Sequence, residues 1–280
     1  IKTIKSNGHT VAMTGDGVND ILAMKESDCS ITVATGSDAT KNIAHIVLMD
    51  NNFNSIPHVV AEGRRVINNI EKSSSLFLMK TIFTMVLAII SIIGGSLFPF
   101  RSNMMTLLEL LVIGLGSFAL SMQPNTNKVN GKFIGYLVSH ALPGASILLF
   151  NVLAFQFIRR IGIDFNEFTP QMYDTLLVAA LTFGGISYLH IICKPYNFYR
   201  ATVVTIITTL SIFMMTLLMP SLFHLPNLFT DFRNENWKFI AILICLIQFD
   251  SILGKVMTFC FESINRFLAK NHVTILSPLD

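Results

Sequence analysis

The chain has few charged residues, few cysteines and no dense basic run. Lysine, arginine, aspartate and glutamate together make up 13% of its 280 residues, whereas a soluble domain carries about a quarter. Most of the chain is therefore expected to lie in lipid. The cysteines are scattered and form no Cys-x-x-Cys pair, which argues against a disulfide framework or a thiolate metal site. Basic and aromatic residues are not interleaved, which argues against a nucleic acid as a partner.

Apolar residues are abundant and unevenly placed. They make up 52% of the chain, and the mean hydropathy is +0.59. Up to about Ser75 the composition is that of a soluble α/β unit. Beyond it follow six apolar stretches, near 76–98, 104–122, 134–158, 175–193, 201–223 and 237–261. Each has about the 20 residues that a helix needs to cross a bilayer, so the sequence predicts an all-α bundle of six transmembrane helices.

The soluble part alternates between strand-like and helix-like segments. The expected strands are 10–13, 29–34 and 46–49. The expected helices are 20–25 and 38–44, the second with Ser37 as N-cap. This alternation predicts a parallel sheet with crossover helices. Because three strands are few for such a domain and the chain begins at Ile1, we expect it to be the C-terminal part of a longer protein.

The run Thr14-Gly15-Asp16-Gly17-Val18-Asn19-Asp20 lies where the first strand gives way to a helix. In open α/β sheets, ligands bind at this carboxyl edge. Gly15 and Gly17 allow a sharp turn and close approach of the backbone to a ligand. Asp16 and Asp20 offer the oxygen ligands that magnesium prefers when it is shared with phosphate. The run therefore predicts a phosphate-and-magnesium site; the alternative is an acidic turn without a ligand.

The order of four short motifs resembles P-type cation-transporting ATPases, most closely the bacterial, calcium-pump-related branch. These motifs lie at 14–20 (TGDGVND), 34–39 (ATGSDA), 50–53 (DNNF) and 62–65 (EGRR). The resemblance implies that residues 1–54 are the C-terminal part of a haloacid-dehalogenase-like phosphorylation domain, and that 55–75 form a stalk helix. It also implies that 76–263 hold the fifth to tenth transmembrane helices and that 264–280 are a cytoplasmic tail.

The resemblance also assigns roles at the sheet edge. Asp16 is expected to coordinate magnesium beside the phosphoryl group, Asp20 to support this site, and Asn19 to hydrogen-bond the phosphate, within a loop that includes Thr14, Gly15 and Gly17. ATP is then the substrate of the complete protein and magnesium its cofactor. The chain contains no Asp-Lys-Thr-Gly, so the phosphorylated aspartate is absent from it. The actuator and nucleotide-binding domains and the first four helices are implied partners outside this sequence.

Ionisable residues within apolar helices are costly and are therefore functional candidates. Glu109 lies early in the second apolar stretch, near Gly114, Gly116 and Ser117, which could loosen the helix and free backbone carbonyls. By the resemblance, Thr81 and Thr84 fall where ion ligands lie on the preceding helix. We therefore expect Thr81, Thr84, Glu109 and Ser117 to contact the transported ion; the alternative for Glu109 is a carboxylate that reaches the interface.

Two further charged residues lie inside apolar stretches. Lys80 is expected to extend its ammonium to the cytoplasmic surface; its alternative role is a counter-charge for Glu109. Asp250 is expected to pack or hydrogen-bond within the bundle rather than to contact the transported ion. Both expectations concern single residues whose neighbours the sequence alone does not identify.

The sequence supports two kinds of function. The first is an ATP-driven cation pump, for calcium or another divalent cation, multi-pass in a bacterial plasma membrane with the soluble part and C-terminus cytoplasmic. The second is non-enzymatic: a truncated membrane remnant or a partner subunit for a separately encoded half. A lipid-translocating relative is a third option. The six trailing helices and the lack of paired cysteines argue against export of copper or zinc.

Overall fold

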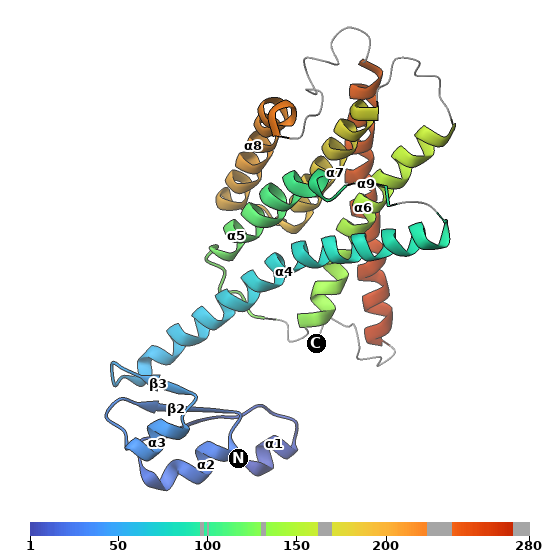
Figure 1. Ribbon diagram of the computed structural model, residues 1–280. Helices are drawn as coiled ribbons and strands as arrows, with labels where there is room; N and C mark the ends of the chain where they lie inside the picture. The colour runs from blue at the N-terminus through green and yellow to red at the C-terminus, as the bar shows by residue number, and fades with distance from the viewer. Residues whose placement is uncertain (96–97, 100, 130–132, 162–169, 223–236, 271–280) are drawn as a thin grey trace. The chain divides into compact units, whose positions relative to one another are not determined.

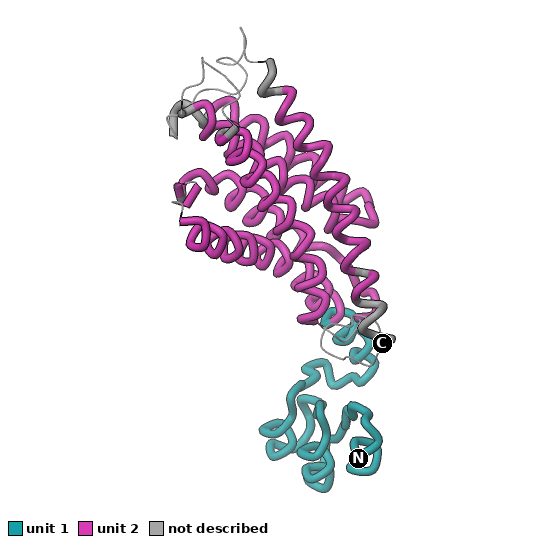
Figure 2. The backbone as a smooth tube through the Cα atoms, turned by 90° about the vertical axis from the view of Figure 1, so that its right-hand side faces the viewer, with its two compact units in different colours: residues 1–63 teal, residues 64–280 magenta. Residues whose placement is uncertain are grey.

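The computed structural model describes residues 1–95, 98–99, 101–129, 133–161, 170–222 and 237–270 (Figure 1). The chain divides into two compact units, residues 1–63 and residues 64–280 (Figure 2). The first unit contains a small sheet with short helices. The second consists of long helices.

The first unit is built on a three-stranded parallel sheet in the order β1 (Ala12–Thr14), β2 (Cys29–Val33), β3 (Ile46–Leu48). The crossover helices are α2 (Ile21–Glu26), which follows the short 3-10 turn η1 (Val18–Asp20), and α3 (Asp38–Ile43). The expected strands, helices and parallel pairing are confirmed, with ends that differ by at most two residues. β2 is the central strand, and Ile31 and Val33 pack with Leu48 in its core.

One helix of this unit is not predicted by the sequence. α1 (Lys2–Ser6) has five residues and buries none of them, so no apolar periodicity marks it. Polar contacts hold it in place. Lys5 Nζ donates to the Glu26 carbonyl at 2.8 Å and lies 3.1 Å from Asp28 Oδ1. A local pattern could not reveal α1, because these contacts are made more than 20 residues away.

The helices of the second unit are α4 (Ile56–Ile93), α5 (Gly116–Ser121), α6 (Phe133–Ile161), α7 (Pro170–Ile192), α8 (Phe198–Leu222) and α9 (Trp237–Lys270). α4 begins within the first unit, after the 3-10 turn η2 (Phe53–Ser55). It ends at Ile93, five residues before the expected end, because Gly94 and Gly95 follow and Gly95 adopts a φ of +59°. α9 continues to Lys270, past the expected end at 261, because no glycine or proline interrupts 262–270.

Among the described residues, five helices are long and apolar enough to cross a membrane. The second predicted stretch differs from them. It consists of a 3-10 turn η3 (Ser102–Met105), a segment η4 (Leu108–Leu115) with i→i+5 hydrogen bonds, and α5; its apolar helix, Leu108–Ser121, is shorter than the other five. The structure therefore supports a multi-helix bundle but does not confirm the expected count of six full-length spans.

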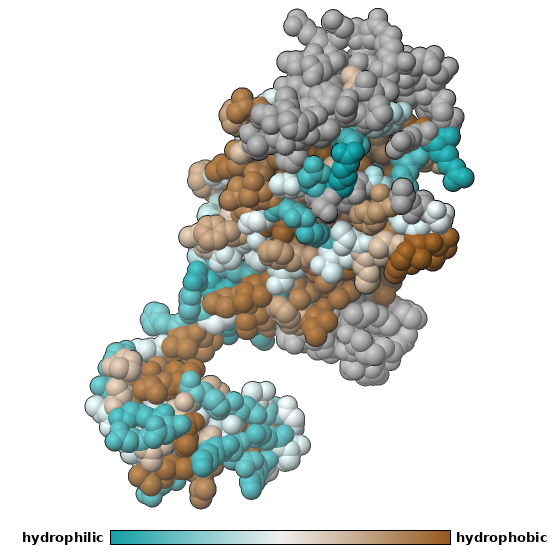
Figure 3. Space-filling view, in the orientation of Figure 1, coloured by the Kyte–Doolittle hydropathy of each residue, from teal (hydrophilic) through white to brown (hydrophobic). Residues whose placement is uncertain are grey.

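α7 lies at the centre of this bundle and packs against α6 and α9. In its most apolar stretch 78% of residues are buried, against 28% for α4 and 22% for α9, so the outer helices expose apolar side chains (Figure 3). Glycines permit the close packing. A side chain at Gly254 on α9 would come within 2.3 Å of Ile191 on α7. Such an apolar exterior suits a lipid environment better than water.

Candidate functional site

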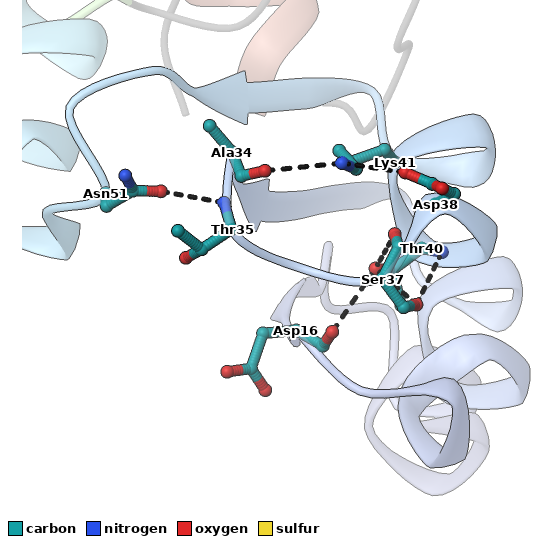
Figure 4. A network of polar contacts seen from close by, with 8 residues as sticks. All are labelled: Asp16, Ala34, Thr35, Ser37, Asp38, Thr40, Lys41 and Asn51. Atoms are coloured by element: carbon teal, nitrogen blue, oxygen red, sulfur yellow. Dashed lines mark hydrogen bonds and ion pairs between the residues drawn. The ribbon is translucent and has the colours of Figure 1, made fainter.

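The loops that follow the three strands are hydrogen-bonded to one another at the carboxyl edge of the sheet. Gly15 N donates to the Ile31 carbonyl at 3.1 Å, which links the loop after β1 to β2. Thr35 N donates to Asn51 Oδ1 at 2.8 Å, which links the loop after β2 to the loop after β3 (Figure 4). The edge is thus one connected surface rather than three independent turns.

Asp16 is held by its backbone while its carboxylate stays available. Its carbonyl accepts from Ser37 N at 3.0 Å and from Thr40 Oγ1 at 3.3 Å. Ser37 is at the same time the N-cap of α3, because its Oγ accepts from Thr40 N at 3.1 Å. The Asp16 side chain is exposed and points away from Ser37 and Thr40 (Figure 4). Among the described residues its carboxylate forms no hydrogen bond or ion pair, so both oxygens are free to bind a ligand.

Asp20 is engaged within the loop. Its Oδ2 accepts from Gly17 N at 3.2 Å. A side chain at Gly15 would lie 2.5 Å from the Asp20 Cβ, so this position has room for glycine only. Asn19 is exposed beside it. The structure therefore brings Asp16, Asn19 and Asp20 into one loop and gives the two carboxylates different environments: that of Asp16 is open, and that of Asp20 shapes the loop.

The described residues offer few side chains that could bind a metal together. They contain no group of three or more histidine, cysteine, aspartate or glutamate side chains arranged to hold a metal. This composition fits magnesium, which binds proteins through one or two carboxylates and completes its shell with water and phosphate oxygens. It does not fit a metal that requires a full cage of protein ligands.

The loop after β3 contains the 50–53 motif, but no role was predicted for its individual residues, although Asp-Asn-Asn turn chemistry is a usable signal. Asn51 adopts a φ of +53° and presents its side chain to Thr35. Asp50 accepts hydrogen bonds from the Ser55 hydroxyl and from Asn52 N. These two donors, the Ser55 hydroxyl first, lower the pKa of Asp50. The loop therefore positions Asn51, which in turn supports the backbone of Thr35 at the candidate site.

The membrane-type helices contain an ion pair. Lys80 Nζ on α4 lies 2.6 Å from Glu109 Oε1 on η4, and both side chains are partly exposed. The Lys80 ammonium lies within hydrogen-bonding distance of the Glu109 carboxylate, so the pairing that the sequence offered as an alternative is present. The counter-charge role, left open by the sequence, is the one observed.

The three candidate hydroxyl ligands bond within their own helices. Thr84 Oγ1 donates to the Lys80 carbonyl at 3.0 Å, Thr81 Oγ1 to that of Phe77 at 3.1 Å, and Ser117 Oγ to that of Gly114 at 3.1 Å. Each oxygen keeps lone pairs that can still accept. Glu109 lies in the i→i+5 segment, a rare geometry that is frequent at functional sites.

Side chains of α4 hold the end of α5 through its backbone. Asn69 Nδ2 donates to the carbonyls of Ser121 and Gln123 at 3.0 and 2.6 Å. Ser73 Oγ donates to the Ser117 carbonyl at 3.0 Å. The two Asn69 bonds satisfy carbonyls at the end of α5 and just after it, where intrahelical partners are lacking. The sequence gives no sign of this arrangement, because the bonded residues are 44 to 54 positions apart in the chain.

α8 supports the same helix end from a second direction. Tyr199 OH donates to the Ala119 carbonyl at 2.7 Å, and Arg200 Nε donates to Gln123 Oε1 at 2.9 Å. Arg200 also donates to the Pro195 carbonyl at 2.6 Å and is 6% exposed. Its charge is thus enclosed by neutral oxygens, which fixes where α8 begins relative to α5.

Comparison with known proteins identifies the family. Residues 1–60 match the haloacid dehalogenase-like hydrolases. Over 82% of its length the chain is 38% identical to the probable cation-transporting ATPase exp7 of Streptococcus pneumoniae, and over 73% it is 37% identical to the calcium-transporting ATPase CtpE of Mycolicibacterium smegmatis. It is 29% identical over 70% of its length to the plasma membrane-type calcium-transporting ATPase 10 of Arabidopsis thaliana.

The chain spans 30% and 27% of the length of the two bacterial relatives. Their names describe cation-transporting ATPases, and the apolar helices described above make this chain a multi-pass membrane protein. The resemblance drawn from the four motifs is confirmed. By similarity along most of its length, the chain belongs to the P-type cation-transporting ATPases.

Proposed function

We propose that this chain forms part of an ATP-driven cation pump that passes through an aspartyl-phosphate. The observation that carries the proposal is Asp16: its backbone is fixed by Ser37 and Thr40, and its carboxylate is open at the carboxyl edge of a parallel sheet. The two bacterial relatives, which align with 82% and 73% of this chain, are named as cation-transporting ATPases. The phosphorylated aspartate and the nucleotide-binding domain belong to sequence outside this chain.

The sheet edge is the proposed magnesium and phosphate site. Asp16 would hold the metal, and Asp20 would keep the loop in shape through Gly17 N. Asn19 and the backbone of Thr14, Gly15 and Gly17 would contact the phosphate. Magnesium, when bound, neutralises charge on the transferring phosphoryl group. What this chain contributes is a carboxylate on a stretch of backbone that Ser37 and Thr40 hold by hydrogen bonds.

The proposed ion path lies between α4 and η4. Glu109, Thr81, Thr84 and Ser117 would supply oxygen ligands, and a divalent cation such as calcium is the proposed cargo, in keeping with the names of the relatives. Because Lys80 is paired with Glu109 Oε1 in this structure, a cation that binds both carboxylate oxygens of Glu109 must displace Lys80. The structure thus supports a closed arrangement of the site.

We further propose the topology. The segment Leu108–Ser121, with its flanking turns, would be the sixth crossing, irregular because it lines the path. Residues 1–54 would complete the phosphorylation domain, 55–75 the stalk, 76–263 the membrane domain and 264–280 a cytoplasmic tail, of which 271–280 lie outside the described residues. The sheet and the C-terminus would face the cytoplasm of a bacterial cell. α4, continuous from Ile56 to Ile93, would carry movement between sheet and membrane.

The test uses the complete protein encoded by the reading frame that contains this chain. Phosphoenzyme formation from ATP is measured against magnesium concentration for the wild type, Asp16→Asn and Asp38→Asn. Asp38 is an exposed carboxylate on α3 and serves as the matched control. We expect Asp16→Asn to lower the rate of phosphoenzyme formation at least 100-fold and Asp38→Asn to leave this rate unchanged. A normal rate in Asp16→Asn would refute the assignment.

A further inference from the structure

A second polar site lies inside the bundle, on helices that carry none of the proposed ion ligands. Asp250 on α9 and Asn151 on α6 are both fully buried. Asn151 Nδ2 donates to Asp250 Oδ2 at 3.0 Å and to the Ala180 carbonyl on α7 at 3.2 Å. The pair therefore joins α6, α7 and α9 at one point, whereas Lys80 and Glu109 lie on α4 and η4.

The surroundings fix the orientation of the Asn151 amide. The Ala180 carbonyl can only accept, so the Asn151 atom that faces it must be the NH₂ group. A side chain at Gly184 would lie 2.7 Å from Asn151 Nδ2, which shows how closely α7 approaches it. The neighbouring rings of Phe150 and Phe249 stack with centroids 4.5 Å apart and hold α6 and α9 in register. The hydrogen-bond roles are thus determined by packing.

Two buried oxygens are left without partners. Both hydrogens of Asn151 Nδ2 are used, and neither Asn151 Oδ1 nor Asp250 Oδ1 has a hydrogen-bond partner within the described residues. A buried polar atom without a partner costs about 1–3 kcal/mol. Both of these oxygens are acceptors, so neither can satisfy the other unless a hydrogen is placed between them.

An ionised Asp250 would also lack a compensating charge. The charged residues nearest to the pair in the sequence of its three helices are Lys255 on α9, Arg159 on α6 and Asp174 on α7, which lie five residues from Asp250, eight from Asn151 and six from Ala180. Lys255 is exposed, and within the described part of the chain no cationic side chain pairs with Asp250. An isolated buried carboxylate is so costly that it normally takes up a proton.

Three occupants can be compared. A calcium or magnesium ion takes about six or more oxygen ligands, and this pair, fully buried from the solvent that would supply the others, offers two free oxygens. A water molecule would donate to both oxygens but would leave the charge in place. One proton on Asp250 removes the charge and gives its Oδ1 a hydrogen to donate, and the unpartnered acceptor Asn151 Oδ1 belongs to the amide that already bonds to Asp250 Oδ2. We propose that Asp250 and Asn151 form a one-proton binding site, separate from the proposed cation path.

The proposal is tested by infrared spectroscopy of the chain in lipid nanodiscs at pH 7. The wild type should show the C=O band of a protonated carboxyl group, shifted by exchange into heavy water. Asp250→Asn should lack this band and still fold, because its amide can donate to Asn151 Oδ1 as the protonated acid does. Asp38→Asn, an exposed carboxylate, is the control and should keep the band.

Further outcomes separate the alternatives. Asn151→Leu should shift the band, because the acceptor of the Asp250 proton is removed. Absence of the band in the wild type would overturn the proposal and favour an ionised Asp250 with water. Persistence of the band in Asp250→Asn would assign the proton to another residue. Loss of the wild-type band on addition of sodium or calcium chloride would show a cation site instead.

Discussion

The ion pair between Lys80 and Glu109 yields the sharpest prediction. At 2.6 Å between Nζ and Oε1, an effective dielectric constant of about 20 gives a gross attraction of about 6 kcal/mol. The cost of removing both groups from water offsets much of this value. We expect a net coupling of about 1–3 kcal/mol, in the range found for residues in direct contact.

The assay is a double-mutant cycle with Lys80→Met, Glu109→Gln and the double variant, followed by unfolding of the chain in lipid–detergent bicelles. Each single variant should destabilise the bundle, since it leaves one charge without its partner. The double variant should be more stable than the sum of the two changes predicts. A coupling below about 0.5 kcal/mol would refute the pair, and Glu109 would then be free to bind a cation without prior release of Lys80.

Three further predictions concern the first unit. Gly15→Ala should displace the Asp20 side chain and destabilise the loop by about 2 kcal/mol. Amide hydrogen exchange at Gly17 should then be faster, and an unchanged exchange rate would contradict the close contact between position 15 and Asp20. Ser37→Ala should cost about 1 kcal/mol through loss of the α3 N-cap, measured by chemical denaturation against the control Ser6→Ala. The pKa of Asp28 is lowered, first by the Val11 N–H and then by Lys5, so the ionised carboxylate stabilises the fold fully above pH ~4 and less as the pH falls below that value. Below pH ~4, amide exchange at Val11, corrected for its intrinsic rate, should therefore rise in the wild type. It should not rise in Asp28→Asn.

Much of the first unit follows from local sequence. Alternating apolar segments and the Ser37 cap are properties of short stretches, and they gave the strands, two helices and the parallel pairing. The seven-residue run gave the loop that holds Asp16 and Asp20. The sequence did not show that Asn51 supports Thr35, because this contact joins residues 16 positions apart. The bond of Asp20 to Gly17 is local and was missed although the residues are only three positions apart.

The bundle was less predictable for a physical reason. Hydropathy reports how apolar a helix is, but it does not report which side chains of different helices meet. The pairs Lys80 with Glu109 and Asn151 with Asp250 join residues 29 and 99 positions apart. Apolar composition likewise did not distinguish the i→i+5 geometry of Leu108–Leu115 from a regular helix.

The attachment of α5 to α4 uses acceptors that every amino acid supplies. Asn69 and Ser73 bind main-chain oxygens of Ser117, Ser121 and Gln123, not their side chains. Replacements of side chains along that short helix can therefore change the surface it presents without removing these hydrogen bonds. The link between α5 and the long helix α4 thus does not depend on which residues α5 carries.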